Sequence, residues 1–211
     1  SLNVLLAGRD TTASLLSWST LLLARHPDIF ARLRNDILEQ FGSYDQPRNM
    51  EFASLKSCQY LQHFLKETLR LYPIVPFNRR CAANDTTLPC GGGKDGTSPI
   101  YVRKGRTVMY STYVLHRRKD IWGEDAEIFN PDRWVDRNVT WEYIPFNRGP
   151  RTCIGQQFAL MRASYVLVRL LQRFDKIEDV NSEKEIRFGV SLTSCPADPV
   201  TVRLHQAETE V

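Results

Sequence analysis

Apolar residues recur at helical spacing in several long stretches of the chain. These stretches span residues 2–24, 27–41, 51–72 and 156–173. The first contains no proline and stops before Pro27, which indicates one long, largely buried helix. The second begins at this proline and is followed directly by Gly42, and both residues are typical of helix boundaries.

Shorter segments with strand character lie between the helical stretches. They are the end of residues 75–82, then 86–88, 100–102, 107–111, and two strands within 186–204 joined by residues 194–199. The glycine-rich residues 90–96 lack the motif of phosphate-binding loops and are expected to form a hairpin turn. Residues 113–116 are expected to form a helical turn, and the aromatic-rich residues 120–143 to be irregular. The pattern predicts a mainly α fold with small β-sheets (α+β), in a single domain over residues 1–211.

Composition excludes several classes of protein. The 211 residues are 42% apolar and 25% charged, as in an ordinary globular protein. The net charge of +4 is mild and dispersed, which argues against a nucleic-acid partner. The five cysteines show no Cys-x-x-Cys spacing, so neither a zinc site nor a disulfide framework is expected and the thiols should be reduced.

The start of the chain predicts that it belongs to a longer protein. The first residue is Ser1 rather than Met, and residues 2–6 already have helical, apolar character. No run approaches the roughly 20 apolar residues that a membrane span requires. We expect any membrane anchor to lie in the missing N-terminal part.

Cys153 lies in a loop that leads directly into the helix predicted from Gln156. Unpaired backbone N–H groups and the helix dipole stabilise a thiolate at such a place, and a thiolate can bind a metal. A lone cysteine is more often a small buried apolar residue than a ligand. The full pattern Phe-x-x-Gly-x-Arg-x-Cys-x-Gly over residues 146–155, with five fixed residue types, favours the ligand.

This pattern resembles the haem-binding loop of the cytochrome P-450 monooxygenases. The resemblance implies that Cys153 is the axial ligand of haem iron, that Phe146 packs beside the porphyrin and that Arg151 pairs with a haem propionate. Gly149 and Gly155 would let the backbone approach a large, flat group. Thiolate ligation favours cleavage of the O–O bond, the step that distinguishes an oxygenase from an oxygen carrier.

Residues 7–12 weaken the first predicted helix, because Gly8 and two threonines are poor helix formers. They can be a helix with a few polar residues on its exposed face. They also resemble the oxygen-activating segment of the same family. By that resemblance Gly8 leaves space for dioxygen, Thr11 hydrogen-bonds the dioxygen and a water, and Asp10 relays protons from solvent.

Glu67 and Arg70 lie three residues apart on one face of the third predicted helix. Such a pair is usually solvated and weak, but apolar neighbours indicate burial here. In the family the pair meets an arginine from a Pro-x-Arg-Phe/Trp segment, which Arg133 matches. Its role would be structural.

The resemblance covers nearly the whole chain and assigns further residues. Arg80 matches a position that contacts a propionate, and the neighbouring Arg79 is the alternative. Residues 190–194 are expected near the substrate. His116, a single histidine before three basic residues, is expected to be structural or exposed and not a metal ligand.

The implied function is oxidation of a small hydrophobic substrate by haem iron, O2 and two electrons. NADPH would supply the electrons through a separate flavoprotein reductase, for which Arg148 and Arg162 are candidate docking residues. The sequences of residues 5–13, 115–126 and 155–160 resemble the fungal alkane and fatty-acid hydroxylase branch of the family. Arg148 departs from that branch, in which a small residue is usual at this position. The expected location is the cytosolic face of the endoplasmic reticulum membrane. The alternatives are a fungal secondary-metabolite oxidase of the same family, or an incomplete, non-catalytic interaction module.

Overall fold

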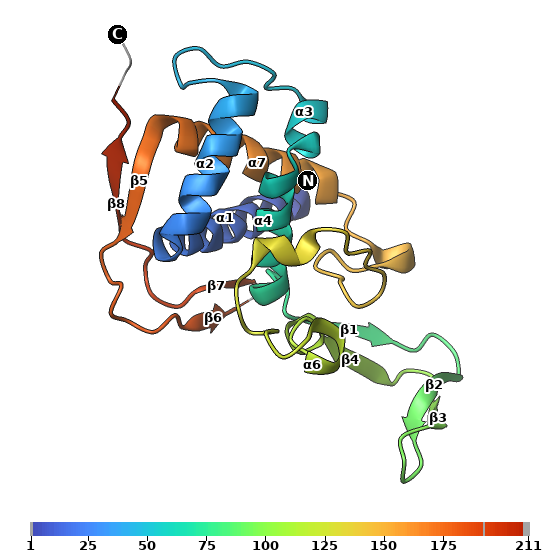
Figure 1. Cartoon of the computed structure of the whole chain (residues 1–211). Helices are drawn as coiled ribbons and strands as arrows, with labels where there is room; N and C mark the ends of the chain where they lie inside the picture. Colours follow the sequence, from blue (N-terminus) through green and yellow to red (C-terminus); the bar gives the residue numbers. More distant parts are fainter. Residues whose placement is uncertain (1, 192, 209–211) are drawn as a thin grey trace.

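The long helices follow the apolar patterns of the sequence in a computed structural model that describes residues 2–191 and 193–208 (Figure 1). The helices are α1 (Leu2–Arg25), α2 (Pro27–Phe41), α3 (Phe52–Ser57), α4 (Gln59–Leu71), α5 (Thr112–Leu115), α6 (Lys119–Trp122) and α7 (Gln156–Arg173), with short 3-10 helices η1 (Pro131–Trp134) and η2 (Gly149–Arg151). Three of the four predicted helices, α1, α2 and α7, are confirmed almost to the residue. Gly42 ends α2 with φ +73°, a conformation that favours glycine.

The prediction of one helix over residues 51–72 is wrong. The chain turns at Cys58, whose backbone is extended, so that α3 and α4 are separate helices. The N–H of Cys58 donates to Ser54 O at 3.1 Å, and its carbonyl accepts from Gln62 N at 3.1 Å. Cys58 is fully buried. Neither proline nor glycine marks this break, so no local sequence signal predicts it.

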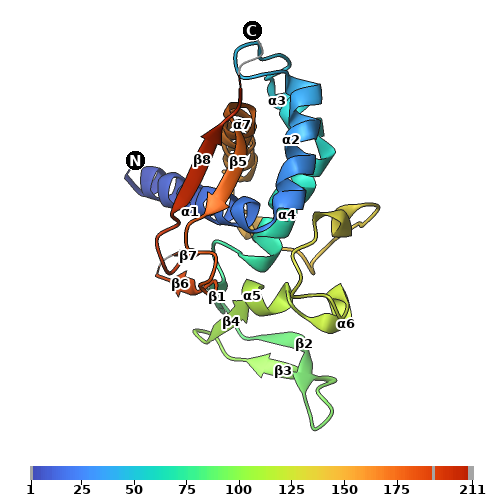
Figure 2. The same cartoon turned by 60° about the vertical axis from the view of Figure 1, so that its left-hand side comes forward.

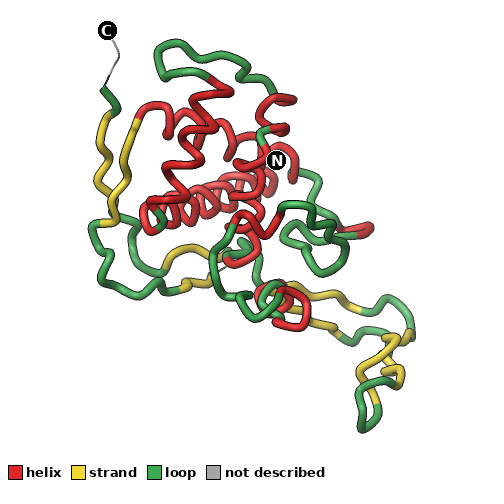
Figure 3. The backbone as a smooth tube through the Cα atoms, in the orientation of Figure 1, coloured by secondary structure: helices red, strands yellow, loops and turns green. Residues whose placement is uncertain are grey.

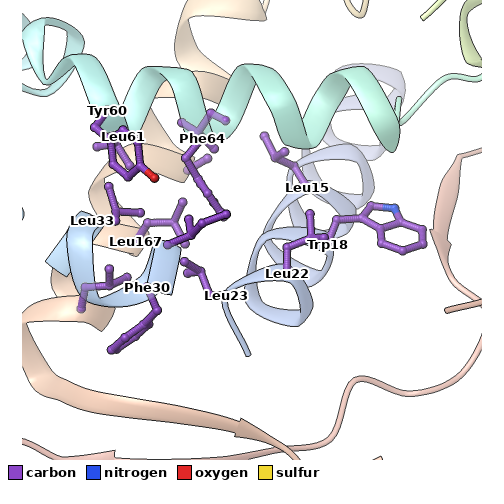
Figure 4. Close-up of a cluster of buried hydrophobic side chains, with 14 of the residues drawn as sticks. Leu15, Trp18, Leu22, Leu23, Phe30, Leu33, Tyr60, Leu61, Phe64 and Leu167 are labelled. Atoms are coloured by element: carbon purple, nitrogen blue, oxygen red, sulfur yellow. The ribbon is translucent and has the colours of Figure 1, made fainter. Parts of the chain in front are cut away.

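Helices α1, α2, α4 and α7 share one apolar core (Figure 4). Its central side chains have at most 2% of their surface exposed and include Leu15, Leu22, Leu33, Phe64 and Leu167. Each such burial contributes about 1.5–3 kcal/mol. A smaller cluster contains Trp122, Ala126 and Trp134. Tyr143 packs against both clusters and leads the chain into the cysteine loop, residues 144–155.

The strands form two-stranded antiparallel ladders around the helices (Figure 3). They are β1 (Phe77–Cys81) with β4 (Thr107–Ser111), β2 (Thr86–Gly92) with β3 (Ser98–Val102), β5 (Phe174–Asp179) with β8 (Val202–Gln206), and β6 (Phe188–Val190) with β7 (Ser194–Pro196). The first two ladders lie far from the C-terminus (Figures 1 and 2). The mainly α fold with small β-sheets is confirmed.

The prediction for residues 186–204 is wrong in two respects. Residues 194–196 form strand β7 and pair with β6, whereas they were expected to lie in the connection between two strands. The last strand, β8, pairs with β5, which was not predicted and follows α7 directly. Only Ile177 of β5 is buried, so the strand lacks the alternation of apolar and polar residues that predicts a strand. Its pairing with the distant β8 defines it instead.

The aromatic-rich residues 120–143 contain most of α6 and all of η1, and are otherwise irregular, as expected. Within the described ranges, none of the helices combines the length and apolar character needed to cross a membrane.

Candidate functional site

Cys153 lies between η2 and α7, at the surface. Its N–H donates to Phe146 O at 2.9 Å, which closes the loop that both residues flank. The side chain is exposed, and no residue that the structure describes hydrogen-bonds to its Sγ. Gly155 precedes the first residue of α7, and a Cβ placed on it would lie 3.9 Å from Sγ. The predicted arrangement, a cysteine immediately before a helix N-terminus, is therefore present.

Two residues of the cysteine loop have left-handed backbone conformations. Asn147 has φ +60° and Gly149 has φ +73°. The side chain of Asn147 is held from another element, because Tyr110 Oη on β4 donates to its Oδ1 at 2.7 Å. The loop is therefore attached to the β1–β4 ladder as well as to α7.

Both arginines expected at the propionates are available. Arg151 is exposed, and neither it nor Arg80 takes part in an ion pair among the described residues. The guanidinium of Arg80 lies 5.6 Å from the ring centroid of Tyr110, the residue that contacts the cysteine loop. Side chains alternate along a strand, so Arg79 is directed to the other face of β1. The ladder therefore places Arg80, and not Arg79, on the strand face of Tyr110, which contacts the cysteine loop.

Glu67 and Arg70 form a buried network, as the resemblance implies. Both side chains are fully buried, and Arg70 Nε and Nη2 donate to the two carboxylate oxygens at 2.8 Å each. Arg133 Nε donates to Glu67 Oε1 at 3.3 Å, and Trp134 Nε1 to Oε2 at 3.0 Å. Asp125 binds the other side of Arg133 at 2.8 Å. The prediction of a buried structural cluster of Glu67, Arg70 and Arg133 is confirmed.

His116 is fully buried and hydrogen-bonded to backbone groups, so it is structural. No cluster of three or more potential metal-binding side chains occurs in the described part of the chain. A site with one protein ligand, as implied for Cys153, needs no such cluster.

The oxygen-activating segment lies in the first half of α1. Thr11 Oγ1 donates to Ala7 O at 2.6 Å and Thr12 Oγ1 to Gly8 O at 2.8 Å, so both threonines bond back to the preceding turn, as expected. Asp10 forms an exposed ion pair with Arg9 at 2.8 Å. No hydrogen bond or ion pair between described residues joins Asp10 or Thr11 to the cysteine loop.

The β6–β7 hairpin, which includes part of the residues 190–194 expected near the substrate, is bonded to the residues that follow α4. Ser194 Oγ donates to Pro73 O at 2.8 Å, and its N–H donates to Ile74 O at 2.8 Å. The β6–β7 hairpin is thereby fixed against the segment that leads from α4 into β1. Val190 of this hairpin is exposed. Of the expected residues 190–194, Leu192 lies outside the described residues.

The residues present fit a haem. The thiol of Cys153 is exposed and without a hydrogen-bonding partner in the described ranges, the adjacent Gly155 has no side chain, and a Cβ on Gly8 of α1 would meet nothing within 4 Å. Arg80 and Arg151 provide two cations without carboxylate partners in the part of the chain that the structure describes. A thiolate, glycine backbone and two cationic groups are the donor set that a flat, anionic iron porphyrin requires.

The roles of Tyr110 and Asn147 and the contacts of His116 were not predicted from the sequence. Asparagine tolerates the left-handed conformation, and this is the one local signal that Asn147 carries. The partners of Tyr110 and His116 are distant along the chain and leave no local pattern.

Comparisons with known proteins identify the family of this chain. The family model described as Cytochrome P450 matches residues 1–200. The chain is 55% identical over 202 residues to Cytochrome P450 monooxygenase g430 of a Fusarium species, covering 96% of this chain and 35% of that protein. It is 53% identical over 205 residues to Cytochrome P450 monooxygenase alt2 of Alternaria solani, covering 94% and 38%. It is also 53% identical over 208 residues to Cytochrome P450 52A13 of Debaryomyces hansenii, covering 96% and 40%.

The chain thus spans at most 40% of the length of these relatives. The family match, however, extends over almost all of its own residues. The chain belongs to the cytochrome P450 family.

Proposed function

We propose that the protein containing this chain is a haem-thiolate monooxygenase, which inserts one oxygen atom of O2 into an organic substrate. The observation that carries the proposal is the exposed thiol of Cys153 just before α7, which no described residue hydrogen-bonds, in a loop closed by the bond from its N–H to Phe146 O. A bound haem would supply oxygen activation and electron transfer, with Cys153 as its axial thiolate. Arg80 and Arg151 would bind its propionates, and Phe146 would pack beside it.

The carbon monoxide difference spectrum of the reduced protein, expressed at its full natural length, tests this function. We expect the Soret band of thiolate-ligated haem in the wild type, and its loss in Cys153→Ser. Cys90→Ser is the matched control, because Cys90 is also exposed but lies on the distant β2–β3 hairpin. Folded wild-type protein without haem would reject the enzyme and leave the non-catalytic interaction module.

Asp10 and Thr11 are the proposed proton-delivery residues. Thr11 Oγ1 donates its proton to Ala7 O, so its oxygen remains available to accept a hydrogen bond from water. Thr12 makes the same kind of bond to Gly8 O but is buried. The two threonines therefore make the same local hydrogen bond but differ in how far their side chains are exposed to solvent.

Coupling between NADPH consumption and product formation distinguishes the two threonines. Thr11→Ala should consume NADPH while forming several-fold less product, and Thr12→Ala should remain coupled. Equal coupling in the two variants would remove Thr11 from the proposed role.

The proposed substrates are long-chain alkanes or fatty acids, hydroxylated at the chain end. The support is the resemblance of three segments to that branch of the family, together with the hydrogen bond that holds Ser194, in the segment expected near the substrate, against Pro73. Binding of dodecanoic or hexadecanoic acid should shift the haem spectrum of the oxidised protein. No shift with any chain length, combined with turnover of a polycyclic compound, would favour the secondary-metabolite oxidase.

The proposed electron donor is an NADPH-dependent flavoprotein reductase that docks beside Arg148 and Arg162. Both arginines are exposed, and neither is in an ion pair among the described residues. Each lies over an exposed aromatic ring, Arg148 at 5.8 Å from Trp141 and Arg162 at 5.5 Å from Phe158. Such cations, free of local carboxylates, are suited to an acidic protein surface.

Stopped-flow reduction tests the docking site. Reversal of both charges to Glu should slow reduction about tenfold at low salt and have little effect at high salt, because the Debye length shortens. Arg103→Glu, an exposed arginine far from the loop, is the control. Unchanged reduction of the double variant would place the docking site elsewhere.

The proposed location is the cytosolic face of the endoplasmic reticulum membrane. It rests on the family resemblance, and subcellular fractionation of the natural host tests it.

A further inference from the structure

His116 bridges the end of α4 and the start of the cysteine loop. It follows α5 and has no exposed surface. Its Nδ1 lies 3.2 Å from Arg70 O, and its Nε2 accepts a hydrogen bond from Ile144 N at 3.0 Å. The residues that it joins are separated by more than seventy positions in the sequence.

The two partners determine the state of the imidazole. A carbonyl oxygen can only accept a hydrogen bond and a backbone N–H can only donate one. His116 must therefore be neutral, with its proton on Nδ1 directed to Arg70 and its Nε2 lone pair directed to Ile144. Both partners are backbone groups. With leucine or phenylalanine in place of His116, the carbonyl of Arg70 and the N–H of Ile144 would each lose a hydrogen bond.

Ile144 begins the turn that carries Phe146. Its carbonyl accepts from Asn147 N at 3.0 Å, and Phe146 O accepts the N–H of Cys153 at 2.9 Å. Backbone hydrogen bonds therefore couple the position of Ile144 to the positions of Phe146 and Cys153. Two residues outside this turn hydrogen-bond to its ends: His116 binds Ile144, the first residue, and Tyr110 binds Asn147, the last.

His116 is itself fixed by its surroundings. Its ring stacks on Tyr143 with the centroids 5.1 Å apart, and contacts the edge of Trp122 at 6.2 Å. Its carbonyl accepts from Arg70 Nη1 at 2.9 Å. The buried Glu67–Arg70 pair thus holds the backbone of His116, while the side chain of His116 holds the cysteine loop.

We infer that His116 is a positioning residue for the haem ligand: its neutral imidazole transfers the rigidity of the buried Glu67–Arg70 network to the cysteine loop and keeps Cys153 in its ligating position. The part of this inference that concerns ligation rests on the proposed function. The part that concerns the loop does not, since its readout is the exchange of the Ile144 amide with solvent.

Two substitutions separate the two bonds of the imidazole. The side-chain amide of His116→Asn reaches the place of Nδ1, so it can keep the bond to Arg70 but loses the bond to Ile144. The longer side chain of His116→Gln reaches the place of Nε2 and can keep the bond to Ile144. His205→Asn, at a half-buried histidine on β8 that lies far from the cysteine loop in the sequence, is the control for a histidine substitution as such.

Hydrogen–deuterium exchange of the Ile144 amide is the first readout, in protein of full natural length. We expect protection in the wild type, in His116→Gln and in His205→Asn, and exchange at least tenfold faster in His116→Asn. The second readout is the carbon monoxide spectrum. His116→Asn should convert to the band of displaced thiolate several-fold faster than the wild type, and His116→Gln at the wild-type rate.

Equal exchange at Ile144 in His116→Asn and the wild type would overturn the inference, as would His116→Gln behaving like His116→Asn. If His116→Asn does not fold, the wild type and His116→Gln provide the test. Protection of the Ile144 amide in both proteins upholds the inference. An unprotected Ile144 amide in either protein overturns it. A wild-type protein that never binds haem would refute the proposed function while leaving the exchange readout intact.

Discussion

Tyr110 Oη donates a hydrogen bond of 2.7 Å to Asn147 Oδ1, which joins strand β4 to the cysteine loop. Asn147 has a left-handed backbone conformation, φ +60°, and the bond holds its side chain in place. Tyr110→Phe should therefore lower the free energy of unfolding by about 1 kcal/mol, measured by urea denaturation. Tyr165→Phe, at an exposed position on α7, should leave it unchanged. Equal effects of the two substitutions would show that the bond does not stabilise the loop.

Gly149 and Gly155 are expected to respond differently to alanine. Gly149 has φ +73°, so Gly149→Ala should destabilise the protein by roughly 1–2 kcal/mol. Gly155 has an ordinary conformation but is the N-cap of α7, where glycine is preferred to alanine, so Gly155→Ala should cost about 0.5–1 kcal/mol. Its new Cβ, however, would lie 3.9 Å from the Cys153 Sγ and should alter the haem spectrum. Thermal denaturation and absorption spectra of both variants check the two expectations, and a reversed order of stability would contradict them.

Gly8 should show a conflict between stability and activity. A Cβ at Gly8 would meet no atom within 4 Å, so Gly8→Ala should stabilise α1 by roughly 0.5–1 kcal/mol. If Gly8 leaves space for dioxygen, the same change should lower product formation several-fold. Measuring Tm and turnover on one preparation tests this. A variant that is stabilised and fully active would show that the space has no role in the reaction.

Glu67→Gln should be among the most destabilising substitutions in the chain. It removes the charge that compensates Arg70, whose side chain is fully buried. Breaking such a pair costs about 3–5 kcal/mol, because the remaining charge cannot reach water. Glu124→Gln, in an exposed pair with Lys119, is the matched control and should cost less than about 1 kcal/mol. Urea denaturation of both variants measures the difference, and similar losses would argue against a role for burial.

Stability should fall on acidification through His116. Burial lowers the pKa of His116 from 6.5 to about 3, because the folded protein holds the neutral form. The resulting stability is fully present above pH 6.5 and is lost as the pH falls toward 3. Between these limits His116 should contribute a slope of about 1.4 kcal/mol per pH unit.

Denaturation of the wild type and of His116→Gln at a series of pH values measures this slope. Because Gln does not titrate, the difference in stability between the two proteins should shrink toward acid. A constant difference from neutral pH down to pH 4 would show that His116 does not stay neutral in the folded state.

The sequence by itself determined the elements whose information is local. The apolar spacing of residues 2–24, 27–41 and 156–173 predicted three helices, because one face of each must be buried. The ten residues from Phe146 to Gly155 indicated the family, through their resemblance to its haem-binding loop. Glu67, Arg70 and Arg133 were predicted as one cluster through the resemblance, and the structure places them in contact.

The tertiary structure decided whatever depends on a distant partner. A turn at Cys58 divides a continuous apolar pattern into two helices, and β5 exists because β8 lies beside it. The strand face that Arg80 shares with Tyr110 supports the proposal that Arg80, and not Arg79, binds a propionate. The bonds from Tyr110 and His116 to the cysteine loop join segments that are far apart along the chain, so no local pattern records them. A sequence motif indicates Cys153 as the proposed ligand, whereas contacts between remote segments hold the loop that carries it.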